Sequence, residues 1–227
     1  MSNDSYIIRA KGVSRAFPVS GKKFWALKDI SCDIPEGALT ILKGRSGSGK
    51  TTLMNILGAL DRPTEGKILY GRKNIVRMSE NERTLLRRRK IGFVFQSVAL
   101  IPMMNALENV EYALRLARYS GNRTERAKEC LRLVGLEKRF KHMPQELSGG
   151  EQQRVAIARA IAHKPDVIFA DEPTGELDTN TGLRVVKIFK DLISAEGVTI
   201  IMTTHDTGLM EIGDCVFEIE DGELKNG

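Results

Sequence analysis

The stretch GRSGSGKTT, at residues 44–52, limits the possible folds of this chain more than any other feature. It fits the pattern G-x-x-x-x-G-K-[ST], directly after the apolar run LTILK and at the start of a helical pattern. Glycines let backbone N–H groups converge on phosphate oxygens, and a helix N-terminus adds partial positive charge. Lys50 supplies a charge for the β- and γ-phosphates, and the Thr51 hydroxyl suits Mg²⁺. A plain glycine-rich turn is the alternative, but the lysine, the threonine and the flanking elements all favour a phosphate-binding loop.

The nucleotide-binding residues expected from this loop are Gly44, Ser46, Gly47, Ser48, Gly49, Lys50, Thr51 and Thr52.

A second motif, DVIFADEPTG, supplies carboxylates. Its apolar residues predict a buried strand, and Asp171 follows at the carboxyl end, where open α/β sheets place their ligands. We expect Asp171 to hold Mg²⁺ through water, and Glu172 to act as the base for the attacking water. The alternative is a helix cap followed by proline at the first helical position. The phosphate-binding loop in the same chain favours the metal site.

The stretch ELSGGEQQR begins like another phosphate site but has no lysine. Ser148 and Glu151 fit the capping box S-x-x-E ahead of a helical pattern, so a well-capped helix is one interpretation. A capping box does not require Gly149 and Gly150, and two glycines at a helix start reduce stability. A serine hydroxyl and bare N–H groups at a helix N-terminus suit a γ-phosphate. We therefore expect this segment to serve an ATP held by another copy of the chain.

These motifs together resemble the ATP-binding subunit of ATP-binding-cassette (ABC) transporters, whose signature motif matches LSGGEQ. The resemblance runs from Tyr6 to Gly222, with the motifs in the family's order. It implies that two copies pair head to tail, and that Ser148, Gly149 and Gly150 contact the γ-phosphate of the partner's ATP. It also implies an α/β fold: a P-loop NTPase (RecA-like) core with an N-terminal antiparallel β-subdomain and an inserted α-helical subdomain.

The resemblance assigns roles to further residues. Gln96, at the end of IGFVFQ, matches the glutamine that senses Mg²⁺ and nucleotide, and His205 in TTHD matches the histidine that positions the γ-phosphate and the attacking water. Taken alone, the first would be a surface residue and the second a core histidine. The expected catalytic residues are Glu172, His205, Lys50 and Gln96. The expected metal-binding residues are Thr51, Gln96 and Asp171.

Two more positions follow from the same resemblance. Phe17 matches the aromatic residue that stacks on adenine, with core packing as the alternative and Trp25 as a weaker stand-in. Asp178 in GELD matches the aspartate that contacts the opposite phosphate-binding loop. Glu176 departs from the small or amide residue that relatives commonly carry there.

Composition sets broader limits. The 227 residues suffice for one compact domain, and a net charge of +6 suits anionic partners. The longest apolar runs are far shorter than a membrane span, and the start lacks a secretory h-region. Three widely spaced cysteines without a CxxC pattern indicate reduced, mostly structural thiols. We expect a cytoplasmic protein, peripheral on the inner face of the cell membrane.

The pattern along the chain predicts one ABC nucleotide-binding domain over residues 1–227. Short β-type runs dominate up to Gln96, with one helix from Gly49 to about Leu60. Residues 104–163 have helical periodicity, and strands return afterwards, separated by a helix near residues 183–193. We expect a largely parallel sheet and assign residues 1–96 and 164–227 to the core with its β-subdomain, and 97–163 to the helical subdomain.

The stretches LMNILGALDRPTEGKI and RRKIGFVFQSVALIPMMNALENVEYAL resemble one branch of the family. This branch includes macrolide exporters (MacB), lipoprotein-releasing ATPases (LolD), antimicrobial-peptide resistance subunits (BceA) and the cell-division ATPase FtsE. It implies a homodimer that works on an integral membrane permease with an extracytoplasmic domain, with a periplasmic or extracellular adaptor as a further partner. The basic run RRRK lacks an aromatic platform for nucleic acid, so we expect a solvated helix end that faces the membrane subunit or lipid headgroups. Met103 and Met104 either line a docking groove or fill the core.

We therefore expect an ATPase, with ATP and Mg²⁺, that powers a permease of the MacB/LolD type in efflux, lipoprotein release or antimicrobial-peptide resistance. An FtsE-like ATPase that controls a cell-wall hydrolase without transport is the alternative. A DNA-repair or chromosome-condensing ABC ATPase would have a long coiled coil between the two glycine motifs, and no sustained heptads occur there. An ABC translation factor would carry two cassettes, and this chain has one.

Overall fold

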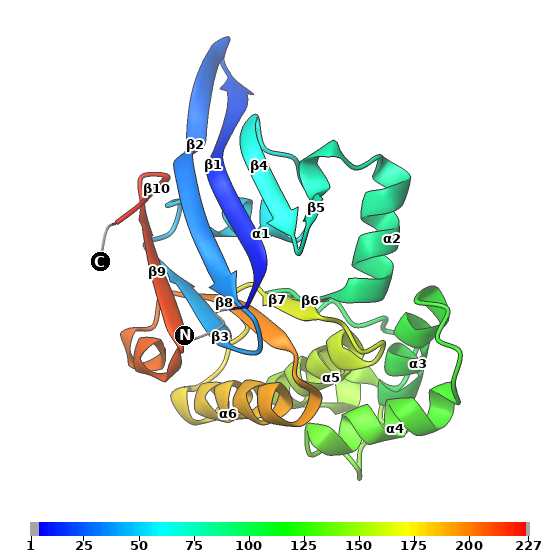
Figure 1. The fold of residues 1–227 in the computed structure, drawn as a ribbon. Coiled ribbons are helices and arrows are strands. Elements are labelled where there is room, and N and C mark those ends of the chain that lie inside the picture. Colours follow the sequence, from blue (N-terminus) through cyan, green and yellow to red (C-terminus); the bar gives the residue numbers. More distant parts are fainter. Residues whose placement is uncertain (1–4, 226–227) are drawn as a thin grey trace. The chain divides into compact units, whose positions relative to one another are not determined.

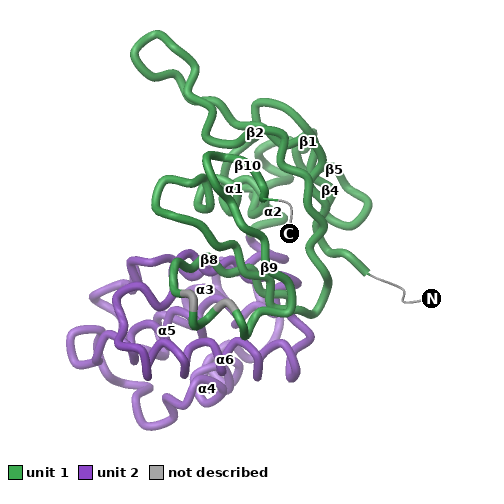
Figure 2. Tube along the Cα trace, turned by 90° about the vertical axis from the view of Figure 1, so that its left-hand side faces the viewer, with its two compact units in different colours: residues 1–87, 199–227 green, residues 88–198 purple. Residues whose placement is uncertain are grey.

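The computed structural model describes residues 5–225 and divides into two compact units. Unit 1 comprises residues 1–87 and 199–227, and unit 2 comprises residues 88–198; Figure 2 shows them in green and purple. Unit 1 is therefore built from both ends of the chain, and unit 2 is a single continuous segment. The predicted division at residues 96 and 164 stays a prediction.

An antiparallel sheet forms the first layer of unit 1, in the order β2-β1-β4-β5 (Figure 1). Its strands are β1 (Tyr6–Val19), β2 (Lys22–Pro35), β4 (Glu65–Tyr70) and β5 (Lys73–Asn74). The pairing of β1 with β2 shifts register several times between Tyr6 and Ala16. Such bulges bend a strand and increase its twist. The sheet is the antiparallel β-subdomain expected from the resemblance.

Parallel strands carry the phosphate-binding loop of unit 1. The strand β3 (Leu39–Lys43) pairs in parallel with β8 (Thr199–Thr204) on one side and with β9 (Cys215–Glu220) on the other. A short strand, β10 (Glu223–Leu224), closes a hairpin with β9, and a 3₁₀-helix spans Thr207–Ile212. All six residues of β8 are buried, as expected of strands covered on both faces. The loop after β3 leads into α1 (Lys50–Leu57).

Two arginines attach α2 (Glu80–Lys90) to the loop that follows α1. Arg83 donates hydrogen bonds to the carbonyl oxygens of Ala59 and Asp61, at 2.7 and 2.8 Å, and Arg87 donates to Ala59 at 2.6 Å. Ala59 and Asp61 follow Gly58, the C-cap of α1, so these hydrogen bonds satisfy carbonyl oxygens of the loop after the helix. A 3₁₀-helix (Ile75–Arg77) precedes α2. Arg87 belongs to the basic run RRRK, so that run is partly engaged within the protein and is not wholly a solvated helix end.

Unit 2 contains a parallel strand pair, β6 (Ile91–Val94) and β7 (Val167–Ala170), and four helices among its residues 88–198. The helices are α3 (Ala106–Leu116), α4 (Arg123–Leu133), α5 (Gly149–Ile161) and α6 (Thr179–Glu196), with a 3₁₀-helix at Pro144–Glu146. Helices α3, α4 and α5 pack against one another (Figure 1).

Arg126 joins three parts of unit 2. Its side chain is 3% exposed, pairs with Glu129 and Glu196, and donates to the carbonyl oxygens of Ile161 and Ala162. A buried guanidinium is tolerated only when such partners compensate for its lost hydration. Unit 2 thus has a fixed connection between α4, α5 and α6.

Candidate functional site

Glycines shape the phosphate-binding loop of unit 1 because side chains do not fit there. Gly49 has φ +110°, and a Cβ atom on it would lie 2.7 Å from the carbonyl oxygen of Ala26. A Cβ atom on Gly44 would lie 2.3 Å from the carbonyl oxygen of Ile219 in β9. A left-handed φ with no room for a side chain is open only to glycine. The loop is therefore held close to the backbone of β2 and β9.

Two polar side chains of this loop point into its own interior. Lys50 is 5% exposed, and its Nζ donates to the carbonyl oxygens of Gly44 and Arg45, at 2.8 and 3.0 Å. The Oγ atom of Ser48 is buried and has no hydrogen-bond partner among the described residues. Buried polar atoms are rarely left in this state, since each costs about 1–3 kcal/mol. A cationic amine and an unsatisfied hydroxyl in a glycine loop fit an anionic ligand.

The parallel register places His205 near the loop. Lys43 lies opposite Thr204 in the β3–β8 pair, so Gly44 and His205 both follow the carboxyl ends of neighbouring parallel strands. His205 is exposed. Ligands of open α/β sheets bind at this edge. The two predicted elements of unit 1, the loop and the histidine, therefore lie at the same edge.

In unit 2, the register of a parallel strand pair likewise brings together Gln96, Asp171 and Glu172. Val94 lies opposite Ala170 in the β6–β7 pair, and the backbone N–H of Asp171 donates to Val94 at 2.8 Å. A Cβ atom on Gly175 would lie 3.5 Å from Oε2 of Glu172 and 3.6 Å from Nε2 of Gln96. The predicted glutamine and the two carboxylates thus share one edge of this strand pair.

The backbone of Glu172 has a left-handed conformation, with φ +42°. Non-glycine residues rarely adopt it, and the cost is about 1–3 kcal/mol when they do. Such conformations are concentrated at functional sites, where the surrounding structure enforces them. Several other non-glycine residues also have a positive φ, but among the predicted catalytic and metal-binding residues only Glu172 does.

The capping box predicted at the start of α5 is present. The Oγ atom of Ser148 accepts from the Glu151 N–H, and the Glu151 carboxylate accepts from the Ser148 N–H at 2.9 Å. The Arg139 guanidinium, followed by the Ser148 N–H, lowers the pKa of Glu151 to about 2. Helix capping therefore explains part of this motif.

The two glycines of this motif meet different surroundings. A Cβ atom on Gly149 would have nothing within 4 Å, whereas one on Gly150 would lie 2.6 Å from Cγ2 of Thr181 in α6. Gly150 thus has a packing reason within unit 2. No such neighbour lies near Gly149 among the described residues, and its predicted contact with a γ-phosphate stays a prediction.

Asp178 caps α6. Its carboxylate accepts from the Thr181 N–H at 3.1 Å, and the hydrogen bond from the Thr181 side chain, followed by that from its N–H, lowers the pKa of Asp178. The aspartate predicted to contact a partner copy is thus already the N-cap of the helix that meets Gly150. Asp178 itself is exposed.

Phe17 lies near the tip of the β1–β2 hairpin, opposite Phe24, and Trp25 lies opposite Ala16. The Phe17 ring is half-buried, which does not suit the alternative of core packing. Sequence reasoning missed two neighbours: Phe24, which is 57% exposed, and Arg15, whose guanidinium carbon lies 4.5 Å from the Phe17 ring centroid. An arginine two residues before an aromatic residue on a strand was the available signal, because such residues share a face.

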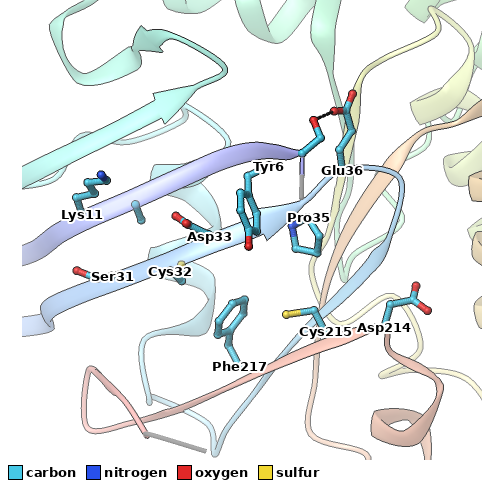
Figure 3. A pocket seen from close by; sticks show the side chains of 12 residues that line it. Tyr6, Lys11, Ser31, Cys32, Asp33, Pro35, Glu36, Asp214, Cys215 and Phe217 are labelled. Atoms are coloured by element: carbon cyan, nitrogen blue, oxygen red, sulfur yellow. Dashed lines mark hydrogen bonds between the residues drawn. The ribbon is translucent and has the colours of Figure 1, made fainter. Parts of the chain in front are cut away.

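Unit 1 also has an open groove of about 1050 Å³ between β1, β2 and β9 (Figure 3). Tyr6, Cys32, Cys215 and Phe217 line it, and it includes none of the predicted site residues. Burial raises the pKa of Cys32 to about 12, so this thiol is protonated at neutral pH and is a poor nucleophile.

Over the described part of the chain, no group of three or more His, Cys, Asp or Glu side chains could hold a metal ion by itself. All three cysteines are free thiols.

Comparison with known proteins identifies the class. The profile of the ABC transporter family matches residues 27–175. The uncharacterized ABC transporter ATP-binding protein MJ0796 of Methanocaldococcus jannaschii is 43% identical over 225 residues, covering 96% of this chain and 95% of that protein. A dimeric structure of the ATP-binding cassette MJ0796 in a post-hydrolysis state, bound to ADP and Pi, superposes with a TM-score of 0.88 at 41% identity, covering 96% and 97% of the two chains.

The chain therefore belongs to the ABC transporter family and is an ATP-binding, ATP-hydrolysing cassette with the predicted α/β P-loop NTPase fold. The macrolide export ATP-binding/permease protein MacB of Agrobacterium fabrum is 46% identical over 219 residues. The match covers 96% of this chain but only 34% of that protein. These relatives do not favour the FtsE-like alternative. Among residues 5–225, none of the helices combines the length and the apolar character of a membrane span.

Proposed function

We propose that this protein binds and hydrolyses Mg·ATP as the motor subunit of a MacB-like membrane complex. The observation that carries the proposal is the left-handed backbone of Glu172, beside Asp171 and Gln96, in a chain of the ABC transporter family. A strained glutamate at a strand end has the position and the chemistry of a general base.

In this proposal, the phosphate-binding loop holds the nucleotide. Backbone N–H groups of the loop and Lys50 neutralise the phosphates, and the Ser48 hydroxyl gains the partner that it lacks among the described residues. The ion-binding oxygens come from Thr51, Asp171 and Gln96. Mg²⁺ supplies charge that stabilises the phosphoryl group during transfer. The aromatic ring of Phe17 stacks on the adenine.

The chemistry is attack of water on the γ-phosphate. Glu172 takes a proton from the water, and His205 holds the water and the γ-phosphate in line, so that the bond between the β- and γ-phosphates breaks. The products are ADP and phosphate, the two ligands of the MJ0796 structure.

The functional unit in this proposal is a head-to-tail homodimer. Ser148, Gly149 and Gly150 of one copy bind the γ-phosphate of the ATP held by the other copy, and Asp178 contacts the opposite phosphate-binding loop. Dimeric structures of MJ0796 support the pairing of two copies. ATP then joins the two copies, and hydrolysis releases them.

The proposed partner is an integral membrane permease, since MacB relatives contain ATP-binding and permease parts in one chain. We extend this to a permease with an extracytoplasmic domain, and to a periplasmic or extracellular adaptor. The cassette then lies on the cytoplasmic face of the membrane. Met103 is 86% exposed, so it does not fill the core and suits the docking surface for this partner.

The substitution Glu172→Gln tests the proposal. It keeps the size of the side chain but removes the base, so we expect ATP turnover to fall by about 10²–10⁴-fold while ATP binding is retained. Phosphate release and equilibrium ATP binding are the two measurements. The exposed Glu137→Gln serves as the matched control and should behave as the unmodified protein. Turnover that is unchanged in Glu172→Gln would remove Glu172 from the mechanism.

A further inference from the structure

One face of the Phe17 ring is covered by a side chain of the same strand. The guanidinium carbon of Arg15 lies 4.5 Å from the ring centroid, within the range of a cation–π contact. The Nε atom of Arg15 is buried and has no hydrogen-bond partner within residues 5–225. Stacking on the ring, rather than hydrogen bonding, therefore accounts for the position of that part of the guanidinium.

An ion pair fixes the other end of the guanidinium. The NH2 nitrogen of Arg15 lies 2.8 and 3.1 Å from the two carboxylate oxygens of Asp61, and the two side chains are 24% and 36% exposed. One nitrogen makes both contacts, so the ion pair holds this end of the guanidinium close to Asp61. Asp61 in turn accepts from the Arg62 N–H at 2.7 Å.

The segment that carries Asp61 is attached to β1 by its backbone. The Thr64 N–H donates to the Ser14 carbonyl oxygen at 2.8 Å, and the Ala16 N–H donates to Oγ1 of Thr64 at 3.0 Å. These bonds flank Arg15 on both sides. The distance between Asp61 and Arg15 is therefore set by the fold of unit 1, not by two mobile side chains.

We propose that Arg15, held by Asp61, is a positioning residue that fixes the Phe17 ring and directs the nucleobase of ATP to its opposite face. This inference rests on the proposed stacking of adenine on Phe17. A ring that is fixed before binding loses less rotational entropy when a base stacks on it. Because one face is covered by Arg15, the base stacks on the other.

The test separates the base from the phosphates. Affinities for ATP and for inorganic tripolyphosphate are measured with the unmodified protein and with Arg15→Ala, Phe17→Ala and the double variant. We expect Arg15→Ala to weaken ATP binding by about two- to fivefold, the effect of one exposed cation–π contact, and to leave tripolyphosphate binding unchanged. In the Phe17→Ala background, removal of Arg15 should have no further effect, because the ring that it positions is gone.

The strand offers a matched control. Arg9, also in β1, lies 4.8 Å from the Tyr6 ring centroid and pairs with Asp33 at 3.9 Å, so Arg9→Ala removes the same kind of contact at another place. It should change neither affinity. Asp61→Asn should weaken ATP binding by part of the amount seen for Arg15→Ala, and it should leave tripolyphosphate binding unchanged.

Three outcomes would overturn the proposal. Tighter ATP binding by Arg15→Ala would mean that the arginine occupies the face used by the base. An equal loss for ATP and tripolyphosphate would mean that Arg15 acts on the phosphates. An unchanged ATP affinity in Phe17→Ala would remove the adenine contact from the proposed function as well, whereas the ATPase assignment itself depends on Glu172→Gln.

Discussion

Gly149 and Gly150 adjoin each other at the start of α5, but only one of them has a neighbour that excludes a side chain. We predict that Gly149→Ala folds with unchanged or slightly higher stability, because a Cβ atom there has nothing within 4 Å and alanine favours helices. ATP turnover should nevertheless fall about tenfold or more, because the added methyl group keeps the γ-phosphate away from the backbone N–H and so costs about one hydrogen bond to a charged group. Thermal unfolding and phosphate release measure the two quantities.

Gly150→Ala provides the contrast. Its Cβ atom would lie 2.6 Å from Cγ2 of Thr181, so overpacking should cost about 1–3 kcal/mol of unfolding free energy. The double variant Gly150→Ala with Thr181→Ser lacks that methyl group and should regain most of this stability. If Gly149→Ala retained full turnover, the proposed contact between the Gly149 backbone and the γ-phosphate would be wrong.

At the scale of elements, the start of α5 depends on a charged capping box. Arg139 and the Ser148 N–H lower the pKa of Glu151 from 4.5 to about 2, so folding favours the ionised carboxylate. The stability that it contributes is fully present above pH 4.5 and is lost as the pH falls toward 2. We predict that Glu151→Gln lowers the unfolding free energy at neutral pH by about 0.5–1 kcal/mol, and that this deficit shrinks below pH 4.5.

Urea unfolding between pH 7 and pH 3 measures this deficit, with Glu137→Gln, another exchange of glutamate for glutamine, as the control. A deficit that stayed constant over the whole range would show that the charge of Glu151 does not matter for the helix cap.

Elements with regular periodicity could be predicted from the sequence, and those with interrupted patterns could not. VIFA became β7 without change, since all four residues are buried. The strand β2 escaped notice because its buried residues Leu27 and Ile30 are three apart, an irregularity that follows from the shifted register with β1. Helix α6 begins at Thr179, earlier than the predicted Leu183, because Asp178 caps it.

The features of the candidate site also fall into two groups, those that the sequence could predict and those that it could not. The sequence located the phosphate-binding loop, the carboxylates and the capped α5 helix, because each of these is a short motif with local chemistry. It could not reveal the pairing of Arg15 with Asp61, 46 residues away, or the contact of Gly150 with Thr181. Such contacts depend on tertiary packing between segments that no local pattern connects.

At the scale of the whole molecule, the proposal divides each active site between two copies, and mixing variants tests this division. Lys50→Ala disables the phosphate-binding loop, and Ser148→Arg disables the start of α5, so each variant alone should be inactive as a dimer. In a mixed dimer, the intact loop of one copy meets the intact α5 of the other. Half of the randomly paired dimers then carry one intact site of two, so we expect about a quarter of the unmodified ATPase rate.

The ATPase rate of the mixture depends on whether the two halves of an active site come from one copy or from two. If the loop and the α5 segment of the same chain served one ATP, every site in the mixture would contain a disabled element, and no activity would return. Each variant at the total concentration of the mixture is the baseline, and phosphate release over a series of mixing ratios is the measurement. If two copies complete each site, the rate is highest when the two variants are present in equal amounts. It falls to the baseline when only one of the two variants is present.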